Sequence, residues 1–247
     1  MPRRRLADRA AALALALLVA GCGSEQDFQR IGGVWHYRKA PIPGADAASF
    51  QVLSAHYARD KARVYYADSE RKGQEYYLVR HDRVDAIDGA DAASFVVLPH
   101  GHGRDRASVY YAGRRLAVED VASFEVLDAD LARDRVRAYC LRRPIPGSHG
   151  ASFVGAGGDY ARDRSRAYHC GLTGDGGRDA TVLPLGGEAP AALEVLASGY
   201  ARTARRVFYR GRPVPGADAP TFTVPTEHDP ESDARDARRR YLAGRPL

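Results

Sequence analysis

Apolar and polar residues alternate in two short bursts that recur along the chain. The first clear copy, FQVLSAHYARDKARVYYA, spans residues 50–67. Phe50 and Val52 would lie on one face of an extended strand while Gln51 lies on the other, which is the alternation of a half-buried β-strand. A second apolar burst at 64–66 follows a charged segment. Each copy therefore predicts two strands joined by a tight polar turn.

The copies keep a fixed register. A Phe or Leu at positions 50, 95, 124, 153 and 193 is followed ten residues later by a short polar residue. These polar residues are Asp60, Asp105, Asp134, Asp163 and Thr203. Five residues further on stands an aromatic residue, namely Tyr65, Tyr110, Tyr139, Tyr168 or Phe208. We expect this aromatic column to form the core, where truncating one ring to Ala would cost about 3–5 kcal/mol.

The distance between copies gives the repeat length. The last residues of the six short apolar strands are Tyr37, Tyr66, Tyr111, Cys140, His169 and Tyr209, which are 29, 45, 29, 29 and 40 residues apart. The unit is therefore 29 residues, with insertions of 16 and 11 residues around 68–85 and 171–187. The second insertion is rich in Gly, and we expect it to form an excursion on one face of the array, where repeat proteins often place binding loops.

Residues typical of turns separate the strands. A short carboxylate in the charged segment can accept hydrogen bonds from backbone amides of the reversal. We therefore interpret the recurring acids as structural Asx-turn residues rather than catalytic groups; they are Asp60, Asp105, Asp134 and Asp163. Pro-Gly segments such as 41–44 end a strand, and Asp46, Asp91, Asp120 and Asp218 stand where each could cap one helical turn.

Such units bury little surface alone and must stack on one another. We predict a mainly β fold, a tandem array of about six β-hairpin repeats of about 29 residues over residues 34–225, curved and open. A closed, six-bladed propeller is the alternative, although a four-stranded blade usually takes about 40–45 residues. Residues 226–247 contain Asp229-Pro230 before a charged stretch, which predicts a short C-terminal helix or a charged tail.

The repeated segment resembles a known family. Asp60-Lys61-Ala62-Arg63-Val64-Tyr65-Tyr66 is similar to the motif of the DKNYY family, with Ala62 in place of the Asn. The resemblance covers residues 34 to about 225 and implies a bacterial repeat protein, often a lipoprotein, without an assigned activity. The fifth copy has Thr203 in place of the Asp, which makes a catalytic role for the motif less credible.

The N-terminus is predicted to be a targeting segment of residues 1–21. A basic region with four Arg precedes the apolar stretch 10–20, which is too short for a bilayer span of about 20 residues. Val19-Ala20-Gly21-Cys22 resembles a bacterial lipobox, in which the cysteine is acylated and becomes the mature N-terminus. We therefore expect a lipidated linker at 22–33 and a membrane anchor at Cys22. Gly23 favours the outer membrane, facing the periplasm; an ordinary signal peptide cut near Ala20 is the alternative.

The composition and charge of the chain restrict the classes of partner that it could bind. The 247 residues are 45% hydrophobic and 28% charged, with a formal charge of +6. Removing residues 1–21 takes away four Arg and one Asp, which leaves 33 basic and 30 acidic side chains. The nearly balanced charge and the predicted location in the cell envelope both argue against nucleic acid as a partner. Cys140 and Cys170 would face an oxidising compartment, so a disulfide is plausible, but Cys170 lies one residue off the position equivalent to Cys140, which leaves the pairing open.

The sequence contains only weak signals for a catalytic, metal-binding or nucleotide-binding site. His100 and His102 resemble an exposed polar pair rather than a metal site, because no Cys or carboxylate pattern completes the ligand set. Neither a nucleophile elbow nor a nucleotide-binding loop is present, and no cofactor is expected. We therefore expect a non-enzymatic envelope lipoprotein whose repeat surface binds another protein or serves as a scaffold. A binder of cell-wall glycan, with exposed Tyr stacking on sugars, is the alternative.

Overall fold

The computed structural model describes residues 27–71, 81–174, 176–227 and 229–247. The predicted signal peptide, residues 1–21, and Cys22 lie outside the described residues. The fold of the described residues is mainly β, as predicted, and α-helix is absent from them. These residues contain no helical segment with the length and apolar character needed to cross a membrane.

Short antiparallel strands form seven sheets in the described ranges, and none of these sheets closes into a barrel. Strands that follow one another in sequence are neighbours in the sheet, so each sheet is a meander. The first sheet consists of β1 (Phe28–Ile31), β2 (Val34–Tyr37) and β3 (Ala40–Pro41). The second consists of β4 (Gln51–Val52), β5 (Tyr57–Arg59), β6 (Val64–Glu70) and β7 (His81–Ala86).

The middle sheets repeat this arrangement. The third sheet consists of β8 (Val96–Val97), β9 (His102–Arg104), β10 (Val109–Tyr111) and β11 (Arg114–Arg115). The fourth consists of β12 (Glu125–Val126), β13 (Leu131–Arg133), β14 (Ala138–Cys140) and β15 (Arg143–Pro144). The fifth consists of β16 (Val154–Gly157), β17 (Tyr160–Arg162), β18 (Ala167–Leu172) and β19 (Arg178–Val182).

The last two sheets complete the array. The sixth consists of β20 (Glu194–Val195), β21 (Tyr200–Arg202), β22 (Val207–Tyr209) and β23 (Arg212–Pro213). The seventh consists of β24 (Ala234–Arg235), β25 (Arg240–Leu242) and β26 (Arg245–Pro246). Single 3-10 turns precede several sheets, namely η2 (Val121–Ser123), η3 (Gly150–Ser152), η4 (Pro190–Ala192) and η5 (Ala219–Thr221). The turns η2 and η5 follow Asp120 and Asp218, as the sequence predicts. The residues after Asp46 and Asp91 form hydrogen-bonded turns rather than 3-10 helices, and η3 and η4 stand where the four Asp predict no helical turn.

The core lies between successive sheets. The aromatic column is buried as predicted, with exposed fractions of 2% or less at Tyr65, Tyr110, Tyr139, Tyr168 and Phe208. Each of these rings packs back onto the preceding sheet; Tyr139, for example, belongs to a cluster with Val109 and Leu116 of the third sheet. A sheet with little area of its own is thereby covered by its neighbours.

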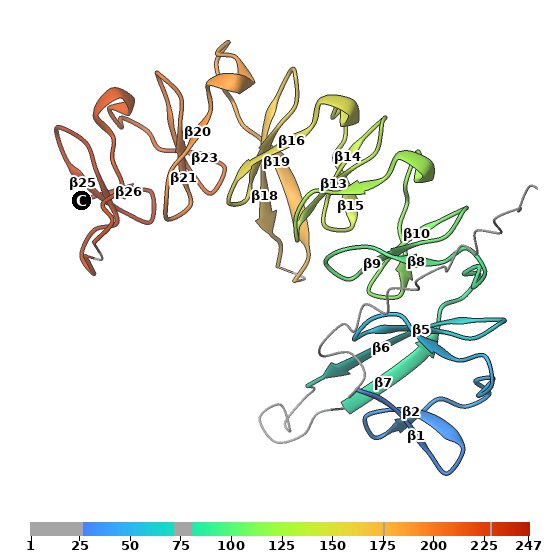
Figure 1. Ribbon diagram of the computed structural model, residues 1–247. Helices are drawn as coiled ribbons and strands as arrows, with labels where there is room; N and C mark the ends of the chain where they lie inside the picture. Colours follow the sequence, from blue (N-terminus) through green and yellow to red (C-terminus); the bar gives the residue numbers. More distant parts are fainter. Residues whose placement is uncertain (1–26, 72–80, 175, 228) are drawn as a thin grey trace, which may run out of the picture.

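The seven sheets follow one another along an open arc (Figure 1). The first sheet lies at one end and the seventh at the other, so the propeller alternative is wrong and the open, curved stack is correct. Neighbouring sheets stay close, as in the contact of Phe222 with Tyr241, whose ring centroids are 5.2 Å apart.

Both insertions lengthen the last hairpin of a sheet. The first extends β6 and β7, and the second extends β18 and β19. Figure 1 shows that these two hairpins project toward the inner side of the arc, whereas the 3-10 turns lie on its outer side. The predicted excursion at 171–187 is therefore present as a projecting hairpin.

The predicted C-terminal helix is wrong, because residues 234–246 form the seventh sheet. Asp236 accepts hydrogen bonds from the amides of Arg238 and Arg239, and Tyr241 is fully buried against the sixth sheet. Burial of this ring and the Asx turn outweigh the helical preference of the charged stretch. The charged residues that suggested a helix lie in the turn instead.

The other end of the array also differs from the prediction. Residues 28–31, which fall within the predicted lipidated linker, form β1, and Phe28 is buried against Tyr37 with ring centroids 5.1 Å apart. The folded array therefore begins before residue 34, because Phe28 completes the core of the first sheet.

Candidate functional site

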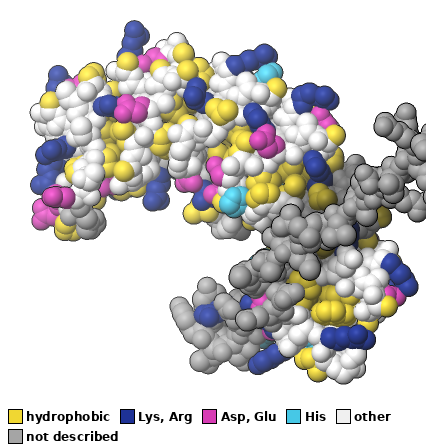
Figure 2. All heavy atoms as spheres, viewed as in Figure 1, with side chains coloured by type: hydrophobic (Ala, Val, Ile, Leu, Met, Phe, Trp, Pro, Cys, Tyr) yellow, Lys and Arg dark blue, Asp and Glu magenta, His cyan; other side chains and the backbone are white. Residues whose placement is uncertain are grey.

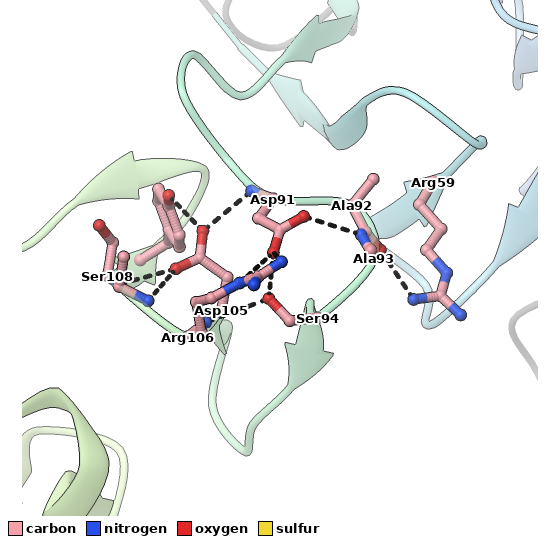
Figure 3. A network of polar contacts seen from close by, with 10 residues as sticks. Arg59, Asp91, Ala92, Ala93, Ser94, Asp105, Arg106 and Ser108 are labelled. Atoms are coloured by element: carbon pink, nitrogen blue, oxygen red, sulfur yellow. Dashed lines mark hydrogen bonds and ion pairs between the residues drawn. The ribbon is translucent and has the colours of Figure 1, made fainter.

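The recurring Asp organises a turn in the second to fifth sheets and in the seventh, and Asp105 illustrates it (Figure 3). Its Oδ1 accepts hydrogen bonds from the amides of Ala107 and Ser108, at 2.8 and 2.7 Å. Its Oδ2 accepts hydrogen bonds from the Asp91 amide at 3.0 Å and the Tyr110 hydroxyl at 2.9 Å. Each carboxylate oxygen thus accepts two hydrogen bonds. Together they join the backbone of the Asx turn to the Tyr110 side chain in the core.

The equivalent acids share this environment. Burial raises their pKa, but hydrogen bonds from backbone amides and a Tyr hydroxyl outweigh it, so the pKa of each carboxyl lies below its ordinary value. This holds for Asp60, Asp105, Asp134 and Asp163. They lie one in each of the second to fifth sheets and do not converge on a common pocket. Their geometry fits a structural role.

The turns after Asp46, Asp120 and Asp218 are only partly capped as expected. Asp46 accepts the Ser49 amide at 3.0 Å, which is the predicted cap. Asp120 and Asp218 stand at the N-cap positions of η2 and η5 but make no side-chain capping bond. Asp120 instead forms an ion pair with Arg135 at 2.9 Å.

A second set of tyrosines, which the sequence did not single out, joins one sheet to the next. The Tyr57 hydroxyl donates to the Gly101 carbonyl at 2.9 Å and accepts from the Gly113 amide at 3.4 Å. Tyr160 makes the same pair of bonds with Gly199 and Gly211 of the sixth sheet. The signal was present in the sequence, because Tyr57, Tyr160 and Tyr200 each stand three residues before the position of the recurring Asp.

Arginines make a further link between sheets. Arg59 donates to the Ala92 carbonyl at 2.9 Å (Figure 3), and Arg133 donates to the Phe153 carbonyl at 2.9 Å. Arg202 donates to the Phe222 carbonyl at 2.8 Å. Each of these arginines stands directly before the recurring Asp position and reaches the 3-10 turn region of the next sheet. They are structural residues whose donors are already engaged within the array.

A disulfide joins Cys140 of β14 to Cys170 of β18, with the two Cα atoms 5.7 Å apart. The sequence left this pairing open because Cys170 lies one residue off the position equivalent to Cys140. The stacking of the sheets explains the offset. A side chain that points forward from the fourth sheet meets one that points backward from the fifth, so the partners must differ by one residue in register. Cys140 and Cys170 fulfil this condition and share a core cluster with Tyr168.

An ion-pair network reinforces the same junction. Arg178 of β19 contacts Asp130 at 3.0 Å and Asp159 at 2.9 Å. It also donates to the Cys170 carbonyl at 2.8 Å. The base of the projecting β18–β19 hairpin is therefore fixed to the fourth sheet by both covalent and ionic contacts.

A groove of about 890 Å³ lies beside this hairpin. Its walls come from β18 and β19 and from the hairpin turns of the sixth and seventh sheets. The charged residues among its lining are Asp159, Asp179, Arg210, Arg212 and Arg245. Leu172, at the end of β18, also lines it and is 75% exposed. This groove is the candidate functional site.

The predicted exposed histidine pair is wrong. His100 is exposed, but the side chain of His102 is 2% exposed and packs between Tyr111 and Phe124. His102 occupies the position that Tyr57 holds in the second sheet, so its ring belongs to the core. Across the described ranges of the chain, no group of three or more His, Cys, Asp and Glu is placed to hold a metal ion.

Aromatic side chains offer no stacking surface in the part of the chain that the structure describes. None of the Phe, Tyr and Trp side chains there is largely exposed, and even the outer positions Tyr66, Tyr111 and Tyr209 are half-buried. Lys and Arg, by contrast, are abundant on the surface (Figure 2). The exposed chemistry is therefore mainly charged, with isolated aliphatic residues such as Leu172 and Val136.

Comparison with known proteins gives one positive result. A family model described as the DKNYY family matches residues 102–244, which is more than half of the chain. No curated protein and no solved structure matches the chain.

Proposed function

The chain belongs to the DKNYY family, and from that membership we propose that it is a non-enzymatic lipoprotein of the bacterial cell envelope whose repeat surface binds another protein or acts as a scaffold. We also infer that the seven sheets are copies of one unit of about 29 residues. The lipobox-like segment Val19-Ala20-Gly21-Cys22 supports an anchor at Cys22, in the outer membrane and facing the periplasm.

The observation that carries the choice of partner is the burial of the aromatic columns. A glycan-binding surface uses exposed rings to stack on sugars, and the described aromatic residues do not supply one. What remains for recognition is the groove beside the β18–β19 hairpin, with basic side chains and the exposed Leu172. Apolar residues within a polar rim are typical of contacts between proteins.

The absence of an enzymatic role is inferred from the use of the recurring acids. Asp134 accepts five hydrogen bonds, from four backbone amides and the Tyr139 hydroxyl. A carboxylate saturated in this way has no capacity left to act on a substrate.

Site-specific photocrosslinking in intact envelopes tests the choice of partner. A photoreactive amino acid at Leu172 should give a discrete protein adduct. The same residue at Val136, which is 50% exposed and lies in the turn after Asp134, serves as the matched control and should not. Adducts that are equal at both sites, or that consist of peptidoglycan fragments at 172, would contradict the proposal.

The anchor is tested separately. Replacing Cys22 with Ser should abolish incorporation of labelled palmitate and release the protein from the membrane fraction, because anchoring requires the acyl chains. Retention of the label in the Ser variant would refute lipidation at this residue. Cys140 and Cys170 are the internal controls, since disulfide sulfurs accept no acyl group.

A further inference from the structure

The groove beside the β18–β19 hairpin contains acids that already have partners. Asp159 lies 2.9 Å from the Arg178 guanidinium, and Asp179 lies 3.4 Å from that of Arg143. The negative charge lining the groove is therefore compensated by arginines of β19 and β15.

The arginines that line the same groove differ from these acids, because they are not paired with an opposite charge in the described part of the chain. Arg210, Arg212 and Arg245 are all exposed, and none of them forms an ion pair with a residue that the structure describes. The Arg210 guanidinium lies over the Tyr209 ring, 5.4 Å from its centroid, which orients the side chain without neutralising it. The uncompensated charge of the groove is therefore positive.

The repeat places Arg212 and Arg245 at equivalent positions of neighbouring sheets. Arg212 opens β23 of the sixth sheet, and Arg245 opens β26 of the seventh, each followed by Pro. Equivalent positions in stacked sheets are about 10 Å apart. This corresponds to about three residues of an extended peptide in the polyproline II conformation, in which side chains three residues apart lie on the same face.

We infer that this groove binds an extended acidic segment of a partner protein, with carboxylates about three residues apart on Arg212 and Arg245 and an apolar side chain against Leu172. The inference rests on the proposed function and specifies the partner's chemistry. Planar guanidinium groups pair with carboxylates through two parallel hydrogen bonds, which gives geometric selectivity. The exposed Leu172 favours a polypeptide over a purely anionic polymer, which has no apolar group to offer.

Binding of a designed peptide tests the inference. The probe is a fluorescein-labelled synthetic peptide with Glu at every third position and Leu between, and its matched partner carries Gln in place of Glu. Fluorescence anisotropy with the full chain in detergent at low salt should show binding of the Glu peptide, weakened by salt. The Arg212→Gln/Arg245→Gln variant should bind about tenfold more weakly, as expected when two exposed charge pairs are lost.

A matched variant controls for net charge. Arg164→Gln/Arg205→Gln removes two exposed arginines from the turns after Asp163 and Thr203, outside the groove, and should bind as the unaltered chain does. Equal binding of the Gln peptide, equal weakening by both variants, or stronger binding of inorganic polyphosphate than of the Glu peptide would overturn the inference. If crosslinking at residue 172 captures a protein while the Glu peptide does not bind, the acidic specificity fails and the proposed function stands.

Discussion

The Tyr139 hydroxyl donates a 2.6 Å hydrogen bond to Asp134, and this pairing recurs five residues apart along the array. The same bond joins Tyr65 to Asp60, Tyr110 to Asp105, Tyr168 to Asp163 and Tyr241 to Asp236. In the sixth sheet both partners change together, because Thr203 replaces the acid and Phe208 replaces the Tyr. Thr203 instead donates to Glu188 at 2.6 Å.

A double-mutant cycle on this pair is predicted to show coupling. Tyr139→Phe should cost about 1.5–3 kcal/mol, the usual value for a hydrogen bond to a charged group. Asp134→Thr should cost more, because several amides also lose their acceptor, but it should cost less in the Tyr139→Phe background by about 1 kcal/mol. Urea denaturation measures each value. Additive effects would show that the two residues do not depend on each other.

Acid is predicted to destabilise the array. Burial raises the pKa of Asp163, but hydrogen bonds led by that from the His149 amide lower it to about 2. Because the folded pKa lies below the unfolded value of about 3.9, stability is present above pH 4 and is lost as the pH falls toward 2. Melting temperatures across this range should fall steeply. Asp163→Thr, which copies the residue found at Thr203, should flatten the dependence; an unchanged profile would exclude Asp163 as a contributor.

Loss of the disulfide should destabilise the chain by about 3–4 kcal/mol, given a separation of 30 residues between Cys140 and Cys170. Denaturation of the Cys140→Ala/Cys170→Ala variant checks the value. A reducing agent should lower the stability of the unaltered chain by a similar amount and leave the variant unchanged. Sensitivity of the variant to the reducing agent would point to another thiol.

The seventh sheet is predicted to contribute to stability as the others do. Tyr241→Ala should cost about 3–5 kcal/mol because a fully buried ring is removed. Arg238→Ala, at an exposed position in the same sheet, should change stability by less than about 0.5 kcal/mol. If both substitutions were neutral in thermal denaturation, residues 234–246 would be a tail.

His102 is predicted to be dispensable for stability. Its Nε2 is buried without a hydrogen-bond partner, and burial lowers the pKa of the ring, which keeps it neutral. The fourth sheet carries Leu131 at the equivalent position. His102→Leu should therefore leave the melting temperature unchanged or raise it, whereas Leu131→His should lower it. A loss of stability in His102→Leu would show that the 3.2 Å hydrogen bond between its Nδ1 and the Pro99 carbonyl outweighs the unpaired Nε2.

Much of the fold follows from the periodic burial of a few side chains. The aromatic column from Tyr65 to Phe208 and the turn-forming Asp could be predicted because both depend on local register alone. The seventh sheet could not be recognised by composition, since Asp, Ala and Arg dominate residues 233–240 and favour helix or disorder. The five-residue spacing of Asp236 and Tyr241 was the signal that the sequence offered.

Contacts between sheets were harder to predict. The hydroxyl of Tyr57 reaches a carbonyl 44 residues away, and no local pattern states which sheet faces which. The direction in which Cys140 and Cys170 point likewise depends on the stacking of two sheets. The groove arises from the turns of three sheets, so its charge balance becomes visible only when ion pairs such as that of Arg178 with Asp159 are known.

Each core cluster combines side chains of neighbouring sheets only, as the cluster of Tyr139 with Val109 illustrates. An in-frame duplication or deletion of one whole copy would therefore leave the joints between the remaining copies unchanged. Evolution can lengthen or shorten such an arc by gene-level events in single steps, and thereby alter how far the molecule extends while its joints stay the same.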